Sequence, residues 1–130
     1  MRSTDWSVKL NQYILNAQKR VFKYGEFDCC IFVADAVKEM TGIDFMEEFR
    51  GKYDTIEGGN LLLETVGKGS LYDTLVNKFG DPVPGVYGTK GDIAFYEDCC
   101  GLILGNRALF CGEAGMILLP IRKIRYTFKV

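Results

Sequence analysis

The sequence predicts an α+β fold in which helices come first and an antiparallel sheet follows. In the first half of the chain, apolar residues recur at helical spacing. After a turn-rich boundary at residues 81–85, the pattern changes to short β-like runs separated by glycine, asparagine and proline. The length of 130 residues suits one domain, and this boundary is too short to be a linker, so residues 1–130 are expected to form a single domain.

The first predicted helix begins near Trp6, where Ser3, Thr4 and Asp5 offer N-caps. Its apolar face consists of Trp6, Leu10, Tyr13, Ile14, Ala17 and Val21. The segment Tyr24–Phe27 contains a glycine and ends this helix.

The second predicted helix runs from about Cys29 to Met40, with Asp28 as its N-cap and Thr41-Gly42 as its stop. Its apolar stripe is Cys30, Val33, Ala34 and Val37, widened by Ile31 and Phe32. A helix this apolar is expected to be largely buried.

Two shorter helices are predicted at Ile56–Val66 and Leu71–Phe79. Ser70 precedes the latter, and Asp73 three residues later makes a near capping box. Gly80 is its expected stop.

Five short strands are predicted in the second half of the chain. They are Asp92–Tyr96, Gly101–Leu104, Ala108–Cys111, Met116–Leu119 and Ile124–Phe128. The carboxylates Asp92, Glu97 and Asp98 are expected to be solvated at a strand end. The basic run Arg122–Lys129 alternates charged and apolar residues, which fits either an edge or surface strand or a strand that docks a partner by sheet extension.

Composition excludes several classes of function. Sixteen Lys and Arg against seventeen Asp and Glu give a formal charge of −1, so no chain-wide basic field attracts nucleic acid. No apolar run reaches the roughly 18 residues of a membrane span. Histidine is absent, which removes the commonest general base and the commonest metal ligand.

The five cysteines are Cys29, Cys30, Cys99, Cys100 and Cys111. Their odd number and the lack of a signal-peptide core suggest synthesis in a reducing cytoplasm, with the thiols free at that stage. Cys29 falls in the first turn of the second predicted helix, where unpaired N–H groups and the helix dipole stabilise a thiolate. Simple packing of Cys29 in the core is the alternative.

Several segments together resemble the NlpC-type, papain-like cell-wall peptidase superfamily. They are Tyr24-Gly25, Asp28-Cys29 with the buried helix after it, Lys90–Phe95, and Cys99–Asn106. The likeness covers Tyr24–Gly42 and Lys90–Pro120. It implies a papain-like fold whose nucleophile position is Cys29, whose histidine position is Cys99, and whose third polar position lies near Cys111.

A cysteine peptidase needs an imidazole to take the thiol proton and return it to the leaving amine. Neither Cys99 nor Cys111 replaces an imidazole, so the resemblance implies a pseudoenzyme, and the chain is not expected to be an enzyme. No cofactor is expected.

The resemblance also makes Cys29, Cys99 and Cys111 converge, which leaves three states open: packed free thiols, a disulfide, or Cys ligands to zinc or an iron–sulfur cluster. A two-residue Gly105-Asn106 loop places Cys111 opposite Cys100, whereas a three-residue Gly105–Arg107 loop places it opposite Gly101, on the Cys99 face.

Members of this superfamily occur in bacteriophage tails, and a small tail-associated branch shares this layout. The resemblance therefore implies a virion component, made in the host cytoplasm, that assembles with other tail proteins of the hub or tip into a hetero-oligomer. One alternative is an active cysteine peptidase or amidase that cleaves peptidoglycan peptides during phage entry, with its base supplied from elsewhere, such as a neighbouring subunit. The other is a Cys-ligated metal or iron–sulfur module.

Overall fold

The computed structural model of the chain describes all 130 residues and has the predicted α+β architecture. Its helices are α1 (Trp6–Ala17), α2 (Cys29–Thr41), α3 (Ile56–Thr65) and α4 (Leu71–Phe79). Its strands are β1 (Val83–Pro84), β2 (Ile93–Tyr96), β3 (Cys99–Ile103), β4 (Arg107–Gly112), β5 (Gly115–Pro120) and β6 (Tyr126–Phe128). The short 3-10 helices η1 (Gly85–Tyr87) and η2 (Ile121–Lys123) flank the sheet. No helix has the length and apolar character that crossing a bilayer requires.

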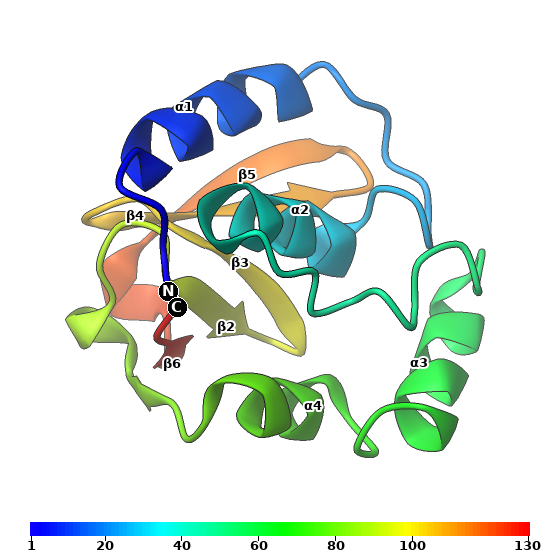
Figure 1. Cartoon of the computed structure of the whole chain (residues 1–130). Coiled ribbons are helices and arrows are strands. Elements are labelled where there is room, and N and C mark those ends of the chain that lie inside the picture. Colours follow the sequence, from blue (N-terminus) through cyan, green and yellow to red (C-terminus); the bar gives the residue numbers. More distant parts are fainter.

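The six strands form one antiparallel sheet in the order β1-β6-β2-β3-β4-β5. Successive hairpins join β2 to β5, and β6 returns to the other side of β2 (Figure 1). Leu102 pairs with Leu109 and Ile103 with Ala108, so the loop is the two-residue Gly105-Asn106, and continuing this register along the strands sets Cys111 opposite Cys100. β1 lies in the segment predicted as a turn-rich boundary; it is two residues long and leaves no periodic signal.

α2 forms the centre of the core, as predicted from its apolar surface. Seven of its residues are buried: Ile31, Phe32, Val33, Ala34, Ala36, Val37 and Met40. The helix lies across the sheet with α1 beside it, and the main core cluster joins all three (Figure 1). Its predicted ends are confirmed: Asp28 caps the first turn, and Gly42 ends the helix in the left-handed conformation with φ 80°.

The other predicted helices are confirmed with small changes at their ends. Thr55 caps α3, and Ser70 caps α4 by accepting the N–H of Asp73 at 3.0 Å. Asp5 occupies the N-cap position of α1, but its side chain makes no capping hydrogen bond.

The inclusion of Val21 in the apolar face of the first helix was wrong. α1 ends at Ala17, and the N–H of Arg20 donates to the Ala17 carbonyl, which tightens the chain into a turn. Val21 therefore lies outside the helix and is 85% exposed.

Both interpretations of the basic run Arg122–Lys129 were also wrong. Its first residues belong to η2, and β6 lies inside the sheet between β1 and β2. Thr127 and Phe128 are fully buried, and the Thr127 hydroxyl donates to the Ile93 carbonyl at 2.9 Å. The open edges of the sheet are β1 and β5 instead.

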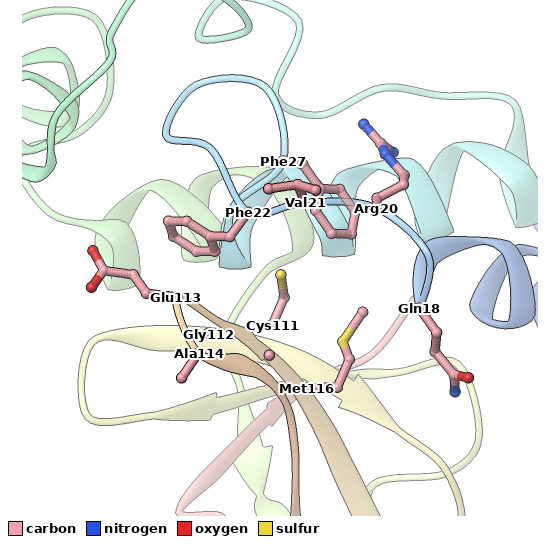
Figure 2. A pocket seen from close by; sticks show the side chains of 11 residues that line it. Gln18, Arg20, Val21, Phe22, Phe27, Cys111, Gly112, Glu113, Ala114 and Met116 are labelled. Atoms are coloured by element: carbon pink, nitrogen blue, oxygen red, sulfur yellow. The ribbon is translucent and has the colours of Figure 1, made fainter.

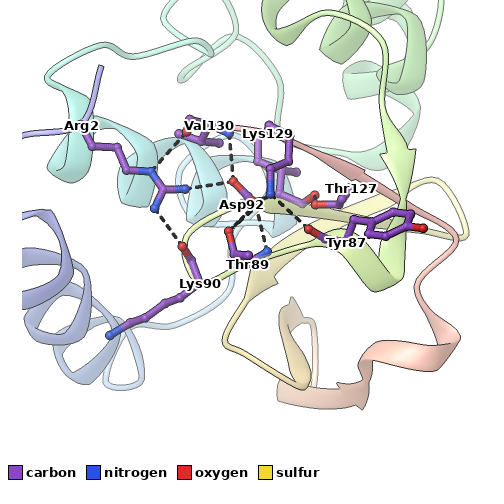
Figure 3. Close-up of polar contacts among 9 residues, drawn as sticks. Arg2, Tyr87, Thr89, Lys90, Asp92, Thr127, Lys129 and Val130 are labelled. Carbon is purple, nitrogen blue, oxygen red and sulfur yellow. Dashed lines mark hydrogen bonds and ion pairs between the residues drawn. The ribbon is translucent and has the colours of Figure 1, made fainter.

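Asp92 is buried rather than solvated, and it ties both ends of the chain to β2 (Figure 3). Its Oδ1 accepts from the Arg2 guanidinium at 2.9 Å and from the Val130 N–H at 3.0 Å. Its Oδ2 accepts from Thr89 and pairs with the Lys129 ammonium at 2.5 Å. Burial raises the pKa of Asp92, but Lys129 and the N–H groups of Thr89 and Val130 outweigh it and hold that pKa below its usual value. By contrast, Glu97 and Asp98 are exposed, as predicted.

Candidate functional site

The candidate site is a cleft of about 510 Å³ at the start of α2. α3 forms one wall, and the turn between β2 and β3 forms another. Every charged side chain that lines this cleft is acidic: Asp28, Glu64, Glu97 and Asp98. Its other side chains are apolar or aromatic, except for the three cysteines Cys29, Cys30 and Cys99 and the polar Asn60 and Ser70.

Asp28 fixes the entry of α2 and thereby places Cys29 at the cleft. Its Oδ1 accepts the N–H of Ile31 at 2.9 Å, which confirms the predicted N-cap. Its Oδ2 accepts the N–H of Gly25 at 3.0 Å and also the hydroxyl of Tyr53. The buried carboxylate therefore holds three separate segments at the first turn of the helix.

Gly25 is required in the loop that leads to Asp28. Its φ of 83° lies in the left-handed region, and a Cβ there would stand 2.0 Å from the Tyr53 carbonyl oxygen. The Gly51 N–H donates to the Gly25 carbonyl at 2.9 Å, which fastens the loop further. The sequence motif Tyr24-Gly25 thus reflects a close approach of two backbone segments.

Cys99 reaches the same cleft from the sheet. It begins β3 directly after the turn Glu97-Asp98, whose residues both have positive φ, 47° and 60°. Two-residue hairpins need such angles, but asparagine and glycine usually supply them, so this turn is strained. Cys99 is exposed there, whereas Cys100 points into the core.

Four sulfurs gather where α2 meets β3. The Sγ atoms of Cys29 and Cys30 are 3.9 Å apart, and the Cys100 thiol donates to the Cys29 carbonyl at 3.7 Å. Hydrogen bonding with Cys100 raises the pKa of Cys30, and hydrogen bonding with Cys29 raises the pKa of Cys100. These two inner sulfurs are therefore thiols at neutral pH.

Cys29 and Cys99 titrate as a pair. Hydrogen bonding with Cys29 lowers the pKa of Cys99 to about 7, against burial and the charges of Asp98 and Glu97. Hydrogen bonding with Cys100 lowers the pKa of Cys29, but Cys30, Cys99 and burial outweigh it and raise that pKa. Coupled thiols lose their protons in two steps that belong to the pair, so one thiolate forms near neutral pH while the second proton is held.

Cys111 does not join this pair. It lies in a separate hollow of about 230 Å³ between the loop after α1 and the β4–β5 turn, among Phe22, Phe27 and Met116 (Figure 2). Burial, followed by the negative charge of Asp28, raises its pKa to about 11. The structure thus brings Cys29 and Cys99 to one cleft but leaves Cys111 outside it, and no group of three or more His, Cys, Asp or Glu side chains is placed to hold a metal ion.

Sequence reasoning missed Tyr53, which completes the hydrogen bonding of Asp28. Burial and the hydrogen bond to Asp28 raise the pKa of Tyr53, so its hydroxyl keeps its proton and donates. Twenty-five residues separate the two side chains, and no local pattern links them. Cys30 and Cys100 were recognised only as neighbours of the predicted site residues.

Comparison with protein families gives one match, which extends over residues 1–130 and is described as a domain of unknown function, DUF6950. The chain belongs to this family. A comparison with curated proteins finds no match. For this DUF6950 member, the chemistry of the cleft is therefore the guide to function: the cleft holds the coupled thiols of Cys29 and Cys99, an acidic lining, and the hydrogen-bonded carboxylate of Asp28.

Proposed function

We propose that the chain is a papain-like domain without peptidase activity that serves as a structural or assembly component of a bacteriophage tail, near the tail tip. The observation that carries the proposal is the meeting of Cys29 and Cys99 in one cleft. When the chain is aligned with the NlpC-type peptidases that it resembles, Cys29 holds the nucleophile position and Cys99 the histidine position, and the two lie far apart in the sequence. Their shared cleft supports that alignment, and the cysteine at the histidine position supports the loss of activity.

The chemistry of the pair also argues against peptide cleavage. Attack on a peptide carbonyl needs a thiolate at Cys29 and a proton donor for the leaving amine. The pKa of Cys29 is raised and that of Cys99 is lowered, so the thiolate of the pair is favoured at Cys99 rather than at the nucleophile position. The carboxylates Glu97 and Asp98 further oppose a second negative charge in the cleft.

In this proposal the chain acts by binding other tail subunits of the hub or tip, as part of a hetero-oligomeric virion assembly formed in the host cytoplasm. The zinc or iron–sulfur alternative loses one of its three candidate ligands, because Cys111 lies outside the cleft that holds Cys29 and Cys99.

Two measurements test the proposal. Purified protein incubated with sacculi should release no free amines, and Cys29→Ala should be indistinguishable from the wild type. Antibody against the chain should label the tail tips of purified virions from its phage. Amine release that Cys29→Ala abolishes would instead establish the peptidase, and virions without the chain would refute the tail assignment.

A further inference from the structure

The strand β5 forms an open edge of the sheet. Its one backbone partner in the sheet is β4, and no strand lies on its outer side. In an antiparallel ladder, every second residue of such a strand directs its N–H and C=O groups away from the sheet. β5 is six residues long, so it presents a row of unpaired backbone groups.

The side chains of β5 do not protect this edge. Proteins usually guard an open edge with charges, prolines, bulges or a very short strand. The opposite edge, β1, follows this rule, since it has two residues and one is Pro84. β5 reads Gly-Met-Ile-Leu-Leu-Pro, so its one proline, Pro120, stands at the end of the strand; the strand carries no charge and exposes Ile117 by 52% and Leu118 by 50%. These two neighbours stand on opposite faces of the strand, so both faces of the edge are apolar.

The charges that flank β5 are complementary to one another. Glu113 lies in the turn before the strand, and the adjacent residues Arg122 and Lys123 lie in η2 after it. All three are exposed, and none forms an ion pair within the chain. Glu113 accepts the Tyr24 hydroxyl with Oε1, which leaves its second oxygen available.

We propose that β5 is a self-association edge, where the β5 strands of two copies of this chain pair antiparallel and join their sheets. A two-fold axis near Leu118 aligns the apolar residues of one strand with those of the other. The same axis places the acidic turn of each copy beside the basic η2 of its partner, so the two charge contacts are equivalent. The apolar residues and flanking charges of β5 are thus complementary to an antiparallel copy of the same strand. This complementarity favours a second copy of the chain over an unrelated strand as the partner.

The inference is independent of the tail assignment, because it rests only on the exposed edge and its flanking charges. Sedimentation equilibrium over a concentration series should show wild-type protein shifting from the 14.6 kDa of one chain to twice that mass. Leu118→Lys should abolish the shift, because two lysines would then face each other across the axis. Leu61→Lys is the matched control, since Leu61 is 58% exposed on α3, away from the edge.

A charge exchange tests the alignment separately. Lys123→Glu should weaken the dimer at least several-fold, and adding Glu113→Lys in the same chain should restore it. Amide hydrogen exchange provides a measurement that needs no substitution: alternate N–H groups of β5 should become protected as the concentration rises. Protein that stays a monomer throughout the series, or a dimer that Leu118→Lys leaves intact, would overturn the proposal.

Discussion

The hydroxyl of Tyr53 donates to the carboxylate of Asp28, and this bond joins the segment before α3 to the first turn of α2. The same carboxylate oxygen accepts the Gly25 N–H, and the second oxygen caps α2. Asp28 is thus the point where the cleft wall, the preceding loop and the helix that carries Cys29 are held together.

Replacement of Asp28 by alanine should destabilise the protein beyond the loss of a cap. Loss of the cap costs about 0.5–2 kcal/mol, and leaving the Tyr53 hydroxyl without its partner costs about 1–3 kcal/mol more. Urea unfolding of Asp28→Ala should therefore show a fall in the free energy of unfolding of about 1.5–5 kcal/mol. Tyr53→Phe is the matched control, because it removes one hydrogen bond and keeps the cap, and its cost should be about 1 kcal/mol. Equal losses in the two variants would contradict this division.

Asp92 should make stability depend on pH. Its folded pKa lies below the unfolded value of about 4. The stabilisation is therefore complete above the unfolded pKa and is lost as the pH falls through the folded pKa. Asp92→Asn should lower the free energy of unfolding by about 3 kcal/mol at neutral pH. The gap between the variant and the wild type should stay constant at neutral pH and shrink as the pH falls below about 4, through the folded pKa of Asp92. Asp81→Asn, which removes the same charge from an exposed site, should leave the wild-type pH profile unchanged.

The parts of this fold that were predicted correctly depend on neighbours in the sequence. The Asp28 cap and the Gly42 stop of α2 lie within a residue of the helix they bound, and the apolar stripe of α2 fixes its burial. The partners of Asp92 illustrate the opposite case: Arg2 lies 90 residues away, so its ion pair leaves no local pattern. A carboxylate at a strand end was therefore expected to be solvated, although it is buried.

The candidate site shows the same division. The position of Cys29 in the first turn of α2 was predicted correctly, because it depends only on neighbouring residues. Cys99 lies at the start of β3, and the short β2–β3 hairpin places it at the cleft. Cys111 depends on register: with the two-residue Gly105-Asn106 loop it stands opposite Cys100, and it then lies in the hollow beside Phe22 and Phe27. The strand order is likewise set by long-range pairing, so the sequence did not predict that the basic C-terminal run lies inside the sheet rather than at its edge.

Alkylation should reveal the coupling of the two cleft thiols. Because hydrogen bonding with Cys29 lowers the pKa of Cys99 to about 7, Cys99 should react with iodoacetamide before the other cysteines near neutral pH. Cys29→Ala removes this interaction, so the pKa of Cys99 should rise and its reaction rate at pH 7 should fall. Peptide mapping by mass spectrometry across a pH series measures both effects. Cys111→Ala should not change the rate, since Cys111 lies in the other hollow; a Cys99 rate that ignores Cys29 would refute the coupling.

Restoring an imidazole at residue 99 tests the alignment behind the proposed function. If Cys99 holds the histidine position, Cys99→His places an imidazole beside the thiol of Cys29 at the first turn of α2. An adjacent imidazolium and a helix N-terminus both stabilise a thiolate, so the pKa of Cys29 should fall by at least one unit. The pH dependence of Cys29 alkylation, followed by peptide mapping, measures that shift. Cys111→His is the matched control, because the same substitution in the separate hollow should leave Cys29 unchanged. A Cys29 pKa that responds equally to both variants would mean that residue 99 does not occupy the histidine position, and the papain-like alignment would fail with it.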